Sequence, residues 1–228
     1  MTFLLTSSGI SNATINDALV DLLGKPISDS TALIVPTGIY PFPGGADRAH
    51  QAICGNARSP FAELGWKALG VVELTALPSI QEDSWIPALR EADVLYVWGG
   101  NVLYLAYWMR QSGVAALLPT LDRLVYVGCS AGSIVATSYN FDVASNLHWV
   151  PEGHEMAVGA DRALGLVDFA LAVHLDHEDF EDSSTDNVAA WAARVPVPTY
   201  AIDDQSAVRV VNGAIDVVSE GRWALFTP

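Results

Sequence analysis

The sequence has little positive charge and few cysteines. Its 228 residues include only 11 Lys and Arg against 26 Asp and Glu, which gives a formal net charge of −15 at pH 7. Such a surface repels phosphate groups, so we expect neither nucleic acid nor an anionic membrane as a partner. Two cysteines are too few for a disulfide framework, and no basic region precedes a long apolar stretch at the amino terminus. We therefore expect a cytoplasmic protein.

Long hydrophobic runs are also missing, because Gly, Pro and charged residues interrupt each apolar stretch. A membrane-spanning helix needs about 18 or more apolar residues in a row, so we expect no such span. Hydrophobic residues nevertheless make up 51% of the sequence and charged residues only 16%. This composition is typical of a globular chain and excludes an acidic disordered one. Without repeats or linkers, it predicts a single domain over residues 1–228.

What the sequence does contain is an alternation of short apolar runs and amphipathic segments. The apolar runs have no polar alternation, which is typical of strands buried on both faces. They span 3–8, 31–36, 68–74, 93–98 and 123–128. Helical spacing of apolar residues occurs between them, at 15–24, 47–66, 79–92 and 101–113. This order predicts an α/β fold, a doubly wound, mostly parallel sheet with helices on both faces.

The last part of the chain has a different pattern. A helical pattern covers 187–195. Short strands follow, and they turn at Asn212-Gly213 and again at Glu220-Gly221. Both turns predict β-hairpins, so we expect a C-terminal β-hairpin beside the parallel sheet.

The strongest chemical signal is the G-x-S-x-G motif at Gly128–Gly132, with Ser130 at its centre. It follows an apolar run and precedes a helical pattern, which is the context of a nucleophile elbow. The glycines allow a sharp turn from strand to helix, which leaves the Ser130 hydroxyl exposed above the sheet. A tight turn built from small residues is the plain structural explanation, but the flanking strand and helix favour a nucleophile.

Backbone N–H groups beside this elbow are expected to bind an oxyanion. The N–H of Ala131 begins the following helix and points toward the charge that develops during attack on a carbonyl. We expect a second donor from Gly100, in the Gly99-Gly100-Asn101 turn that follows a predicted strand. Asn101 is suited to cap the next helix and is also a candidate substrate-binding residue.

A serine nucleophile needs a general base, which is most often a histidine. His174 stands where an apolar run ends, at the expected carboxyl end of a strand, and is the favoured base. His177 lies three residues later and is the second choice.

Taken together, these residues resemble the dipeptidase E and cyanophycinase family of serine peptidases. The resemblance rests on GGN at 99–101, YVGCSAGS at 126–133 and LGL at 164–166, with His174 eight residues after the last leucine. It implies a doubly wound α/β fold with the nucleophile, base and oxyanion donors named above. It also implies that no metal or other cofactor is used.

The acid that orients the histidine is less clearly marked. The family usually takes it from the loop after the nucleophile helix, and the corresponding position here is Ser145. Asp142 is the nearest carboxylate and the first choice. Glu152 and Glu155 follow on the same segment, and Asp204, at the end of a predicted strand, is the last alternative.

Substrate specificity does not carry over directly. Dipeptidase E binds an amino-terminal aspartate, which calls for an arginine shortly after the catalytic histidine. Residues 175–186 instead contain six acids, and no basic residue occurs before Arg194. This charge suits a free amino terminus or a basic side chain, although a solvated acidic loop is the plainer explanation. Trp149 is a candidate wall of the substrate pocket.

Three other interpretations compete. His174, Asp176 and His177 are of the donor types that bind zinc, so a metal-dependent hydrolase is one alternative. A non-catalytic α/β binding protein is another, because a fold does not determine function. Cys129 introduces a cysteine-nucleophile alternative, but the motif places Ser130 at the elbow and turns Cys129 toward the sheet.

The sequence thus predicts a serine peptidase of the exopeptidase or dipeptidase type that hydrolyses short peptides without a cofactor. The seven tryptophans also suggest a homodimer.

Overall fold

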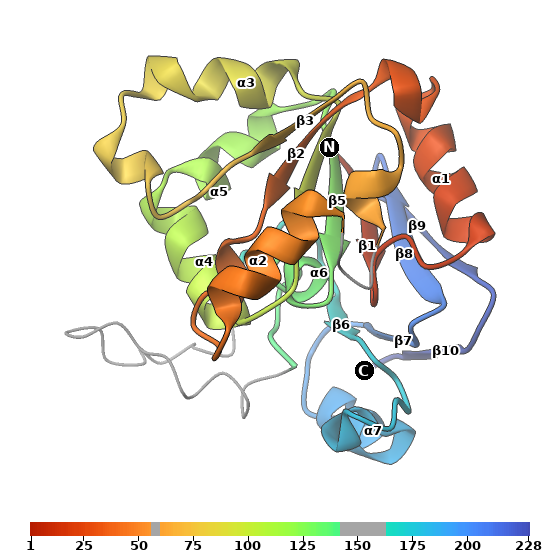
Figure 1. Ribbon diagram of the computed structural model, residues 1–228. Coiled ribbons are helices and arrows are strands. Elements are labelled where there is room, and N and C mark those ends of the chain that lie inside the picture. Colours follow the sequence, from red (N-terminus) through yellow and green to blue (C-terminus); the bar gives the residue numbers. More distant parts are fainter. Residues whose placement is uncertain (56–59, 142–162) are drawn as a thin grey trace.

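The computed structural model describes residues 1–55, 60–141 and 163–228 (Figure 1). Its strands are β1 (Thr2–Thr6), β2 (Thr31–Val35), β3 (Ala68–Val71), β4 (Val94–Val97), β5 (Val125–Cys129), β6 (Ala170–Ala172), β7 (Thr199–Ile202), β8 (Ser206–Val211), β9 (Ala214–Ser219) and β10 (Trp223–Phe226). Its α-helices are α1 (Ala13–Leu23), α2 (Gly45–Cys54), α3 (Ile86–Glu91), α4 (Val102–Gln111), α5 (Val114–Leu117), α6 (Ala131–Ile134) and α7 (Thr185–Ala192). Each of these helices is shorter than a membrane-spanning segment.

The larger sheet contains seven strands in the order β3-β2-β4-β5-β1-β8-β9. Its first five strands are parallel to one another, whereas β8 pairs with β1 in the antiparallel direction. The mostly parallel α/β sheet predicted from the sequence is therefore confirmed. β8 and β9 form the predicted hairpin around Asn212-Gly213, whose φ angles of 52° and 82° suit a type I′ turn.

Helices cover both faces of this sheet, as the alternation of strand and helix predicts (Figure 1). α1 and α2 pack on one face through a buried cluster that includes Leu19 and Ala52. α3, α4 and α5 pack on the opposite face through a cluster that includes Leu89, Leu105 and Val114. The strands between them are apolar on both sides, which is why their sequences lack polar alternation.

Two of the predicted helices are shorter than expected. Within 47–66 the α-helix α2 ends at Cys54, because Gly55 adopts a left-handed conformation with φ 82°, and a 3-10 turn follows at Phe61–Glu63. The pattern over 79–92 produces 3-10 turns and then α3, whose first turn contains Pro87. Glycine and proline therefore interrupt helices that the apolar spacing alone would continue.

A second sheet of three strands, in the order β10-β7-β6, lies beside the larger one, with α7 close to it (Figure 1). The turn at Glu220-Gly221 does not fold β10 back onto β9, so the prediction of a hairpin there is wrong. β10 pairs with β7 instead, in the antiparallel direction. The physical reason is packing, because Ala224 and Phe226 cover a small core formed with Ala201 of β7 and Val188 of α7.

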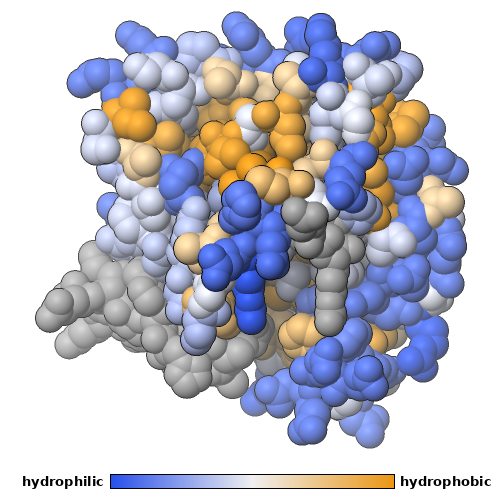
Figure 2. Space-filling view, viewed as in Figure 1, coloured by the Kyte–Doolittle hydropathy of each residue, from blue (hydrophilic) through white to orange (hydrophobic). Residues whose placement is uncertain are grey.

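One edge of the larger sheet is apolar and exposed. Figure 2 shows hydrophobic side chains gathered in the upper part of the face that it displays, where the edge strand β3 lies. Val71 of β3 has 47% of its surface exposed. Apolar edges of this kind favour contact with another chain. The predicted homodimer stays a prediction, because a single chain does not test it.

The carboxyl ends of several strands meet at one place. β1, β4 and β5 are neighbours or near neighbours in the larger sheet and end at the same edge. The smaller sheet directs the segments after β6 and β7 toward this edge, where the Leu175 N–H donates to the Ile202 carbonyl at 3.1 Å. Residues that follow these strand ends are therefore brought together although they are distant in sequence.

Candidate active site

Ser130 lies on a sharp turn between β5 and α6. Its backbone has φ 52° and ψ −117°, a strained conformation for a residue other than glycine. The flanking glycines are required because side chains do not fit. A Cβ on Gly128 would lie 2.6 Å from the Ser133 Cα, and one on Gly132 would collide with the carbonyl of Val97. The G-x-S-x-G motif therefore has the geometry of a nucleophile elbow.

His174 follows β6 and approaches Ser130 from the side of the smaller sheet. Its Nε2 atom lies 2.9 Å from the Ser130 Oγ, which is hydrogen-bond distance. The imidazole is 12% exposed, and the ring of Phe180 stacks on it with a centroid distance of 4.2 Å and an interplanar angle of 8°. The structure thus brings the favoured base into contact with the serine of the motif.

Asp204 lies on the other side of the imidazole, in the turn between β7 and β8. Its Oδ1 atom is 2.6 Å from the His174 Nδ1. Burial acts to raise the pKa of Asp204, but hydrogen bonds from His174 and Ser7 outweigh it, so the pKa of this carboxyl lies below its ordinary value. The carboxylate is therefore held in its ionised form beside the imidazole.

Asp204 was the last of the four acids that the sequence offered. Asp142, Glu152 and Glu155 lie outside the described residues, so a contact of these residues with His174 stays a prediction. Asp204 is 30 residues from His174 along the chain, and no local motif connects the two. The signal that points to it is its place directly after a predicted strand, at the edge of the sheet where Ser130 lies.

Sequence reasoning missed Ser7, which directly follows β1 and is fully buried. Its hydroxyl lies 2.6 Å from the Asp204 Oδ1 and 3.3 Å from the His174 Nδ1. The backbone N–H of His174 donates to the same hydroxyl at 2.8 Å. A polar residue at the end of a strand beside the strand of Ser130 was the available signal.

The predicted oxyanion donors stand next to the elbow. A Cβ on Gly99 would lie 3.3 Å from the Ser130 Cβ, so this turn passes directly beside the serine. Gly100 has φ 131°, and a side chain there would collide with the carbonyl of Gly38. Ala131 is the first residue of α6, where backbone N–H groups have no partner within the helix. Both positions are compatible with the predicted donors.

Asn101 has a clear structural role. It is buried, with 2% of its surface exposed, and its side-chain oxygen accepts the Tyr104 N–H at 2.9 Å as the N-cap of α4. The predicted capping is therefore confirmed, and the substrate-binding role stays a prediction. Trp149, the other predicted substrate-binding residue, lies outside the described residues.

The three donors of the metal alternative do not converge. The Asp176 carboxylate accepts hydrogen bonds from the N–H and hydroxyl of Thr185 at 2.8 and 2.9 Å. His177 faces Asp204, with its Nε2 3.7 Å from the Oδ2. Within the described ranges, no group of three or more His, Cys, Asp or Glu side chains is arranged to hold a metal ion. The arrangement favours a serine mechanism over a metal-dependent one.

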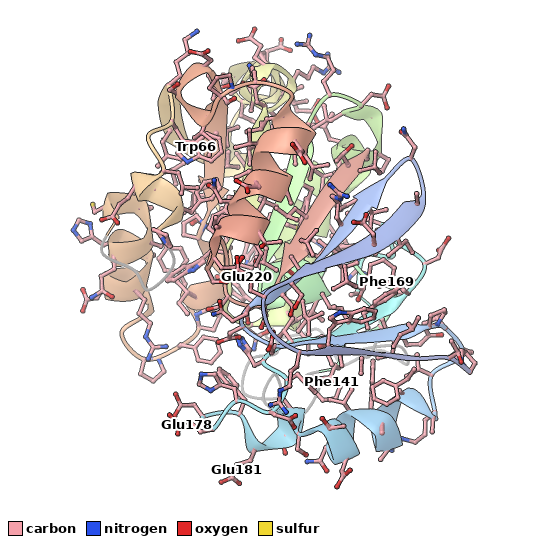
Figure 3. The ribbon with its side chains drawn as sticks, turned by 90° about the vertical axis from the view of Figure 1, so that its right-hand side faces the viewer. Trp66, Phe141, Phe169, Glu178, Glu181 and Glu220 are labelled. Atoms are coloured by element: carbon pink, nitrogen blue, oxygen red, sulfur yellow. The ribbon has the colours of Figure 1, made fainter. Side chains whose placement is uncertain are left out.

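The acidic residues after His174 face solvent. All six of them are exposed, namely Asp176, Glu178, Asp179, Glu181, Asp182 and Asp186. Figure 3 shows Glu178 and Glu181 at the outer rim of the molecule. Arg222 Nη2 lies 3.5 Å from Asp176 and partly balances this charge. The plainer explanation, a solvated acidic loop, fits these positions.

Cys129 is buried beneath the elbow, with 6% of its surface exposed. Burial raises the pKa of its thiol to about 11, so the thiolate that a cysteine nucleophile needs is disfavoured. Its sulfur lies 3.9 Å from the Ser7 carbonyl, on the neighbouring strand segment. This position agrees with the motif register and disfavours the cysteine alternative.

The sequence profile of Peptidase family S51 matches residues 3–218. The chain therefore belongs to this family, and the resemblance to peptidase E drawn from the motifs is confirmed. It is a serine-type peptidase, which is a hydrolase.

Individual relatives agree with this assignment. The uncharacterized peptidase Lin0382 of Listeria innocua is 29% identical over 173 residues, which cover 68% of this chain and 79% of the relative. The uncharacterized peptidase Lmo0363 of Listeria monocytogenes is 28% identical over 126 residues, which cover 53% of this chain and 57% of the relative.

Two solved structures share the fold. A crystal structure described as a candidate peptidase E protein from Listeria monocytogenes EGD-e has a TM-score of 0.67 and 19% identity, and the match covers 96% of this chain and 98% of that one. A peptidase from an acI-B1 Actinobacterium has a TM-score of 0.60 and 17% identity, covering 99% of this chain and 93% of that one. At these identities the likeness concerns the fold.

Proposed function

We propose that this chain is a serine exopeptidase that hydrolyses short peptides, with Ser130 as the nucleophile, His174 as the general base and Asp204 as the acid that orients the base. A continuous line of contacts carries the proposal. The Ser130 Oγ is 2.9 Å from Nε2, and Nδ1 is 2.6 Å from the Asp204 Oδ1. Three side chains from separate segments meet in the order that acyl transfer requires.

The contacts also support an assignment of the imidazole proton in the resting site. An ionised carboxylate only accepts hydrogen bonds, so Nδ1 of His174 donates its N–H to Asp204. In the neutral imidazole that a general base requires, Nε2 is unprotonated and accepts the hydrogen of the Ser130 hydroxyl. The lowered pKa of the Asp204 carboxyl supports this assignment, because the acid stays ionised at neutral pH.

The reaction then proceeds by acyl transfer. His174 takes the proton of Ser130 while the serine oxygen attacks the scissile carbonyl, and the N–H groups of Ala131 and Gly100 stabilise the oxyanion. Protonated His174 gives its proton to the leaving amine, the C–N bond breaks, and an acyl-enzyme remains. Water that is deprotonated by His174 then hydrolyses this ester and restores the serine.

We do not propose that the substrate carries an aspartate at its amino terminus. The segment after His174 is acidic and exposed, which would weaken the binding of a second carboxylate. Arg222 reaches this segment, but it pairs with Asp176. A free amino terminus, which every short peptide has, is compatible with this charge.

The test is hydrolysis of a dipeptide library with Asp-X, Lys-X, Gly-X and Ala-X members. Wild type should cleave some members, and Ser130→Ala should cleave none. Ser138→Ala is the matched control, because Ser138 lies eight residues after Ser130 and its hydroxyl donates to the Val167 carbonyl at 2.9 Å, so the variant should keep full activity. Equal turnover by Ser130→Ala, or no cleavage by wild type, would overturn the proposal.

A further inference from the structure

A buried serine outside the three residues named above connects two of them. Ser7 has no exposed surface, and its hydroxyl contacts both the Asp204 carboxylate and the backbone of His174. Buried hydroxyl groups normally donate one hydrogen bond and accept at least one. The two contacts of the Ser7 hydroxyl are therefore enough to satisfy it. What is particular is the identity of the partners, which are the base and the acid of the proposed mechanism.

Counting hydrogens assigns the direction of each bond. A hydroxyl has one hydrogen, and an ionised carboxylate has none, so Ser7 donates to the Asp204 Oδ1 at 2.6 Å. Its lone pairs are then left to accept the His174 backbone N–H at 2.8 Å. The Asp204 Oδ1 thus receives two hydrogen bonds, one from Ser7 and one from the imidazole Nδ1. The carboxylate oxygen is held from two directions.

The backbone of His174 needs such support. Its φ is 57°, in the left-handed region that residues with side chains adopt only at a cost. The bond from its N–H to the Ser7 hydroxyl holds the residue in this conformation, which aims the imidazole at Ser130. Strained backbone persists only where surrounding contacts determine it.

The sheet places Ser7 and Ser130 in register. Thr6 pairs with Cys129 in the parallel ladder of β1 and β5, and the Ser130 N–H donates to the Thr6 carbonyl at 3.1 Å. Each serine is therefore the next residue on one of two hydrogen-bonded strands. A contact to Ser7 fixes the base and the acid relative to the same rigid ladder that carries the nucleophile.

We propose that Ser7 is a positioning residue that locks the His174 backbone and the Asp204 carboxylate to strand β1, so that the imidazole is held in line with Ser130. This inference rests on the proposed function. Ser7 does not touch the reacting atoms, and its effect passes through Asp204 and His174. Loss of its hydroxyl changes no residue that would contact the substrate, but the His174 imidazole is then held less firmly in position.

The first test is Ser7→Ala, which removes one oxygen atom from a buried site. We expect kcat to fall about 10- to 100-fold with KM nearly unchanged, because small misplacements of a base have effects of this size. Ser112→Ala is the matched control, since it removes another buried serine hydroxyl near the far end of α4. It should leave both kinetic constants within about twofold. Equal losses in the two variants, at equal folded fractions, would overturn the inference.

A double-mutant cycle with Asp204→Asn distinguishes an effect of Ser7 that passes through Asp204 from a non-specific effect on the structure. If Ser7 acts through Asp204, then Ser7→Ala should cost much less in the Asp204→Asn background than in wild type. Additive losses would show that Ser7 acts independently and would contradict the inference. Should Ser7→Ala be unstable, Ser7→Cys replaces the oxygen with a larger sulfur that is a weaker donor, and kcat should fall in the same direction.

The rate at which a fluorophosphonate reacts with Ser130 gives a readout that needs no peptide. This rate depends on activation of the serine, so Ser7→Ala should slow it by the same factor as kcat. A fast reaction in wild type without cleavage of any peptide would contradict the peptidase proposal while leaving the role of Ser7 testable. A wild-type rate in Ser7→Ala would overturn the role of Ser7 alone.

Discussion

Two carboxylates at opposite ends of the larger sheet have similar surroundings and different consequences. Asp93 precedes β4 at the amino ends of the strands, where it accepts hydrogen bonds from Lys25 Nζ at 2.8 Å and from the Thr31 N–H at 2.8 Å. Asp204 lies at the carboxyl ends, where His174 and Ser7 are its partners. Each carboxyl has a pKa below its ordinary value.

The difference lies in what the partner can do. The contacts of Asp93 are with the Lys25 ammonium group and with the N–H and hydroxyl of Thr31, so they join the segment after α1 and the start of β2 to the start of β4. The partner of Asp204 is an imidazole, which can both donate and accept a proton, and its other nitrogen contacts Ser130. Ser130 and His174 both have positive φ, so this end of the sheet holds strain that the other pair does not need. Position relative to the strand ends, and not carboxylate chemistry, separates the acid proposed to orient a base from the acid that joins two segments of the chain.

The largest loss of activity is expected from removal of the nucleophile. Ser130→Ala should lower kcat about 10⁴-fold or more, and His174→Ala should do the same, because the two act as a unit. The double variant should be no slower than either single one. Steady-state kinetics on a cleaved dipeptide measures this. Multiplicative losses in the double variant would show that the two residues do not act together.

The next effect concerns the turn beside the elbow. Gly100→Ala should lower kcat about 10²- to 10³-fold, because the added methyl group would collide with the Gly38 carbonyl and displace an oxyanion donor. Gly113→Ala is the control, since Gly113 also has positive φ but has no atom within 4 Å of the added Cβ. It should cost stability and leave kcat unchanged, and equal kcat losses in both would contradict the oxyanion role.

A smaller effect is expected from the aromatic ring that covers the base. Phe180→Ala should lower kcat about 2- to 10-fold, because a stacked ring contributes about 0.5–1.5 kcal/mol to holding its partner. Phe180 is itself 44% exposed, so the change should alter stability little. Ile215→Ala, at a site that is 40% exposed on β9, is the control and should not change kcat. An unchanged kcat in Phe180→Ala would show that the Phe180 ring does not help to hold the imidazole of His174.

The smallest effect is expected at the structural acid. Asp93→Asn should lower the free energy of unfolding at pH 7 by about 0.5–1 kcal/mol and leave kcat unchanged. Because the folded-state pKa of Asp93 is lowered from 3.8, its contribution is present above that value and is lost as the pH falls through the lower one. Urea unfolding of both proteins at pH 7 and at pH 3 checks the sign. A stability difference that grows in acid would be inconsistent with the lowered pKa.

The sequence predicts those parts of the site that local chemistry determines. The elbow follows from glycines that close contacts require, and His174 follows from the end of an apolar run. Asp204 also follows a predicted strand, but this marker does not show that it contacts His174, because that contact joins two loops 30 residues apart. Ser7 is 167 residues from His174 and reaches it only through the pairing of β1 with β5. A polar residue at a strand end is therefore only a general signal, because the order of the strands in the sheet decides which of these residues meet.

The same limit applies to the fold. The parallel core was predictable because its strands are buried on both faces and therefore continuously apolar. The smaller sheet was not, because β6 and β10 have only 3 and 4 residues and both pair with β7. The turn at Glu220-Gly221 resembles the hairpin turn at Asn212-Gly213, and only the small core around Phe226 directs β10 to another sheet.

The role of Asp204 in orienting the base can be measured with one pair of variants. Asp204→Asn and Asp93→Asn make the same chemical change at the two ends of the sheet, and kcat is measured for both beside wild type. The account predicts that Asp204→Asn loses about 10³- to 10⁴-fold in kcat, because the imidazole is no longer held in the required tautomer, while Asp93→Asn keeps the wild-type rate. A fully active Asp204→Asn would contradict the account and move the role to another acid.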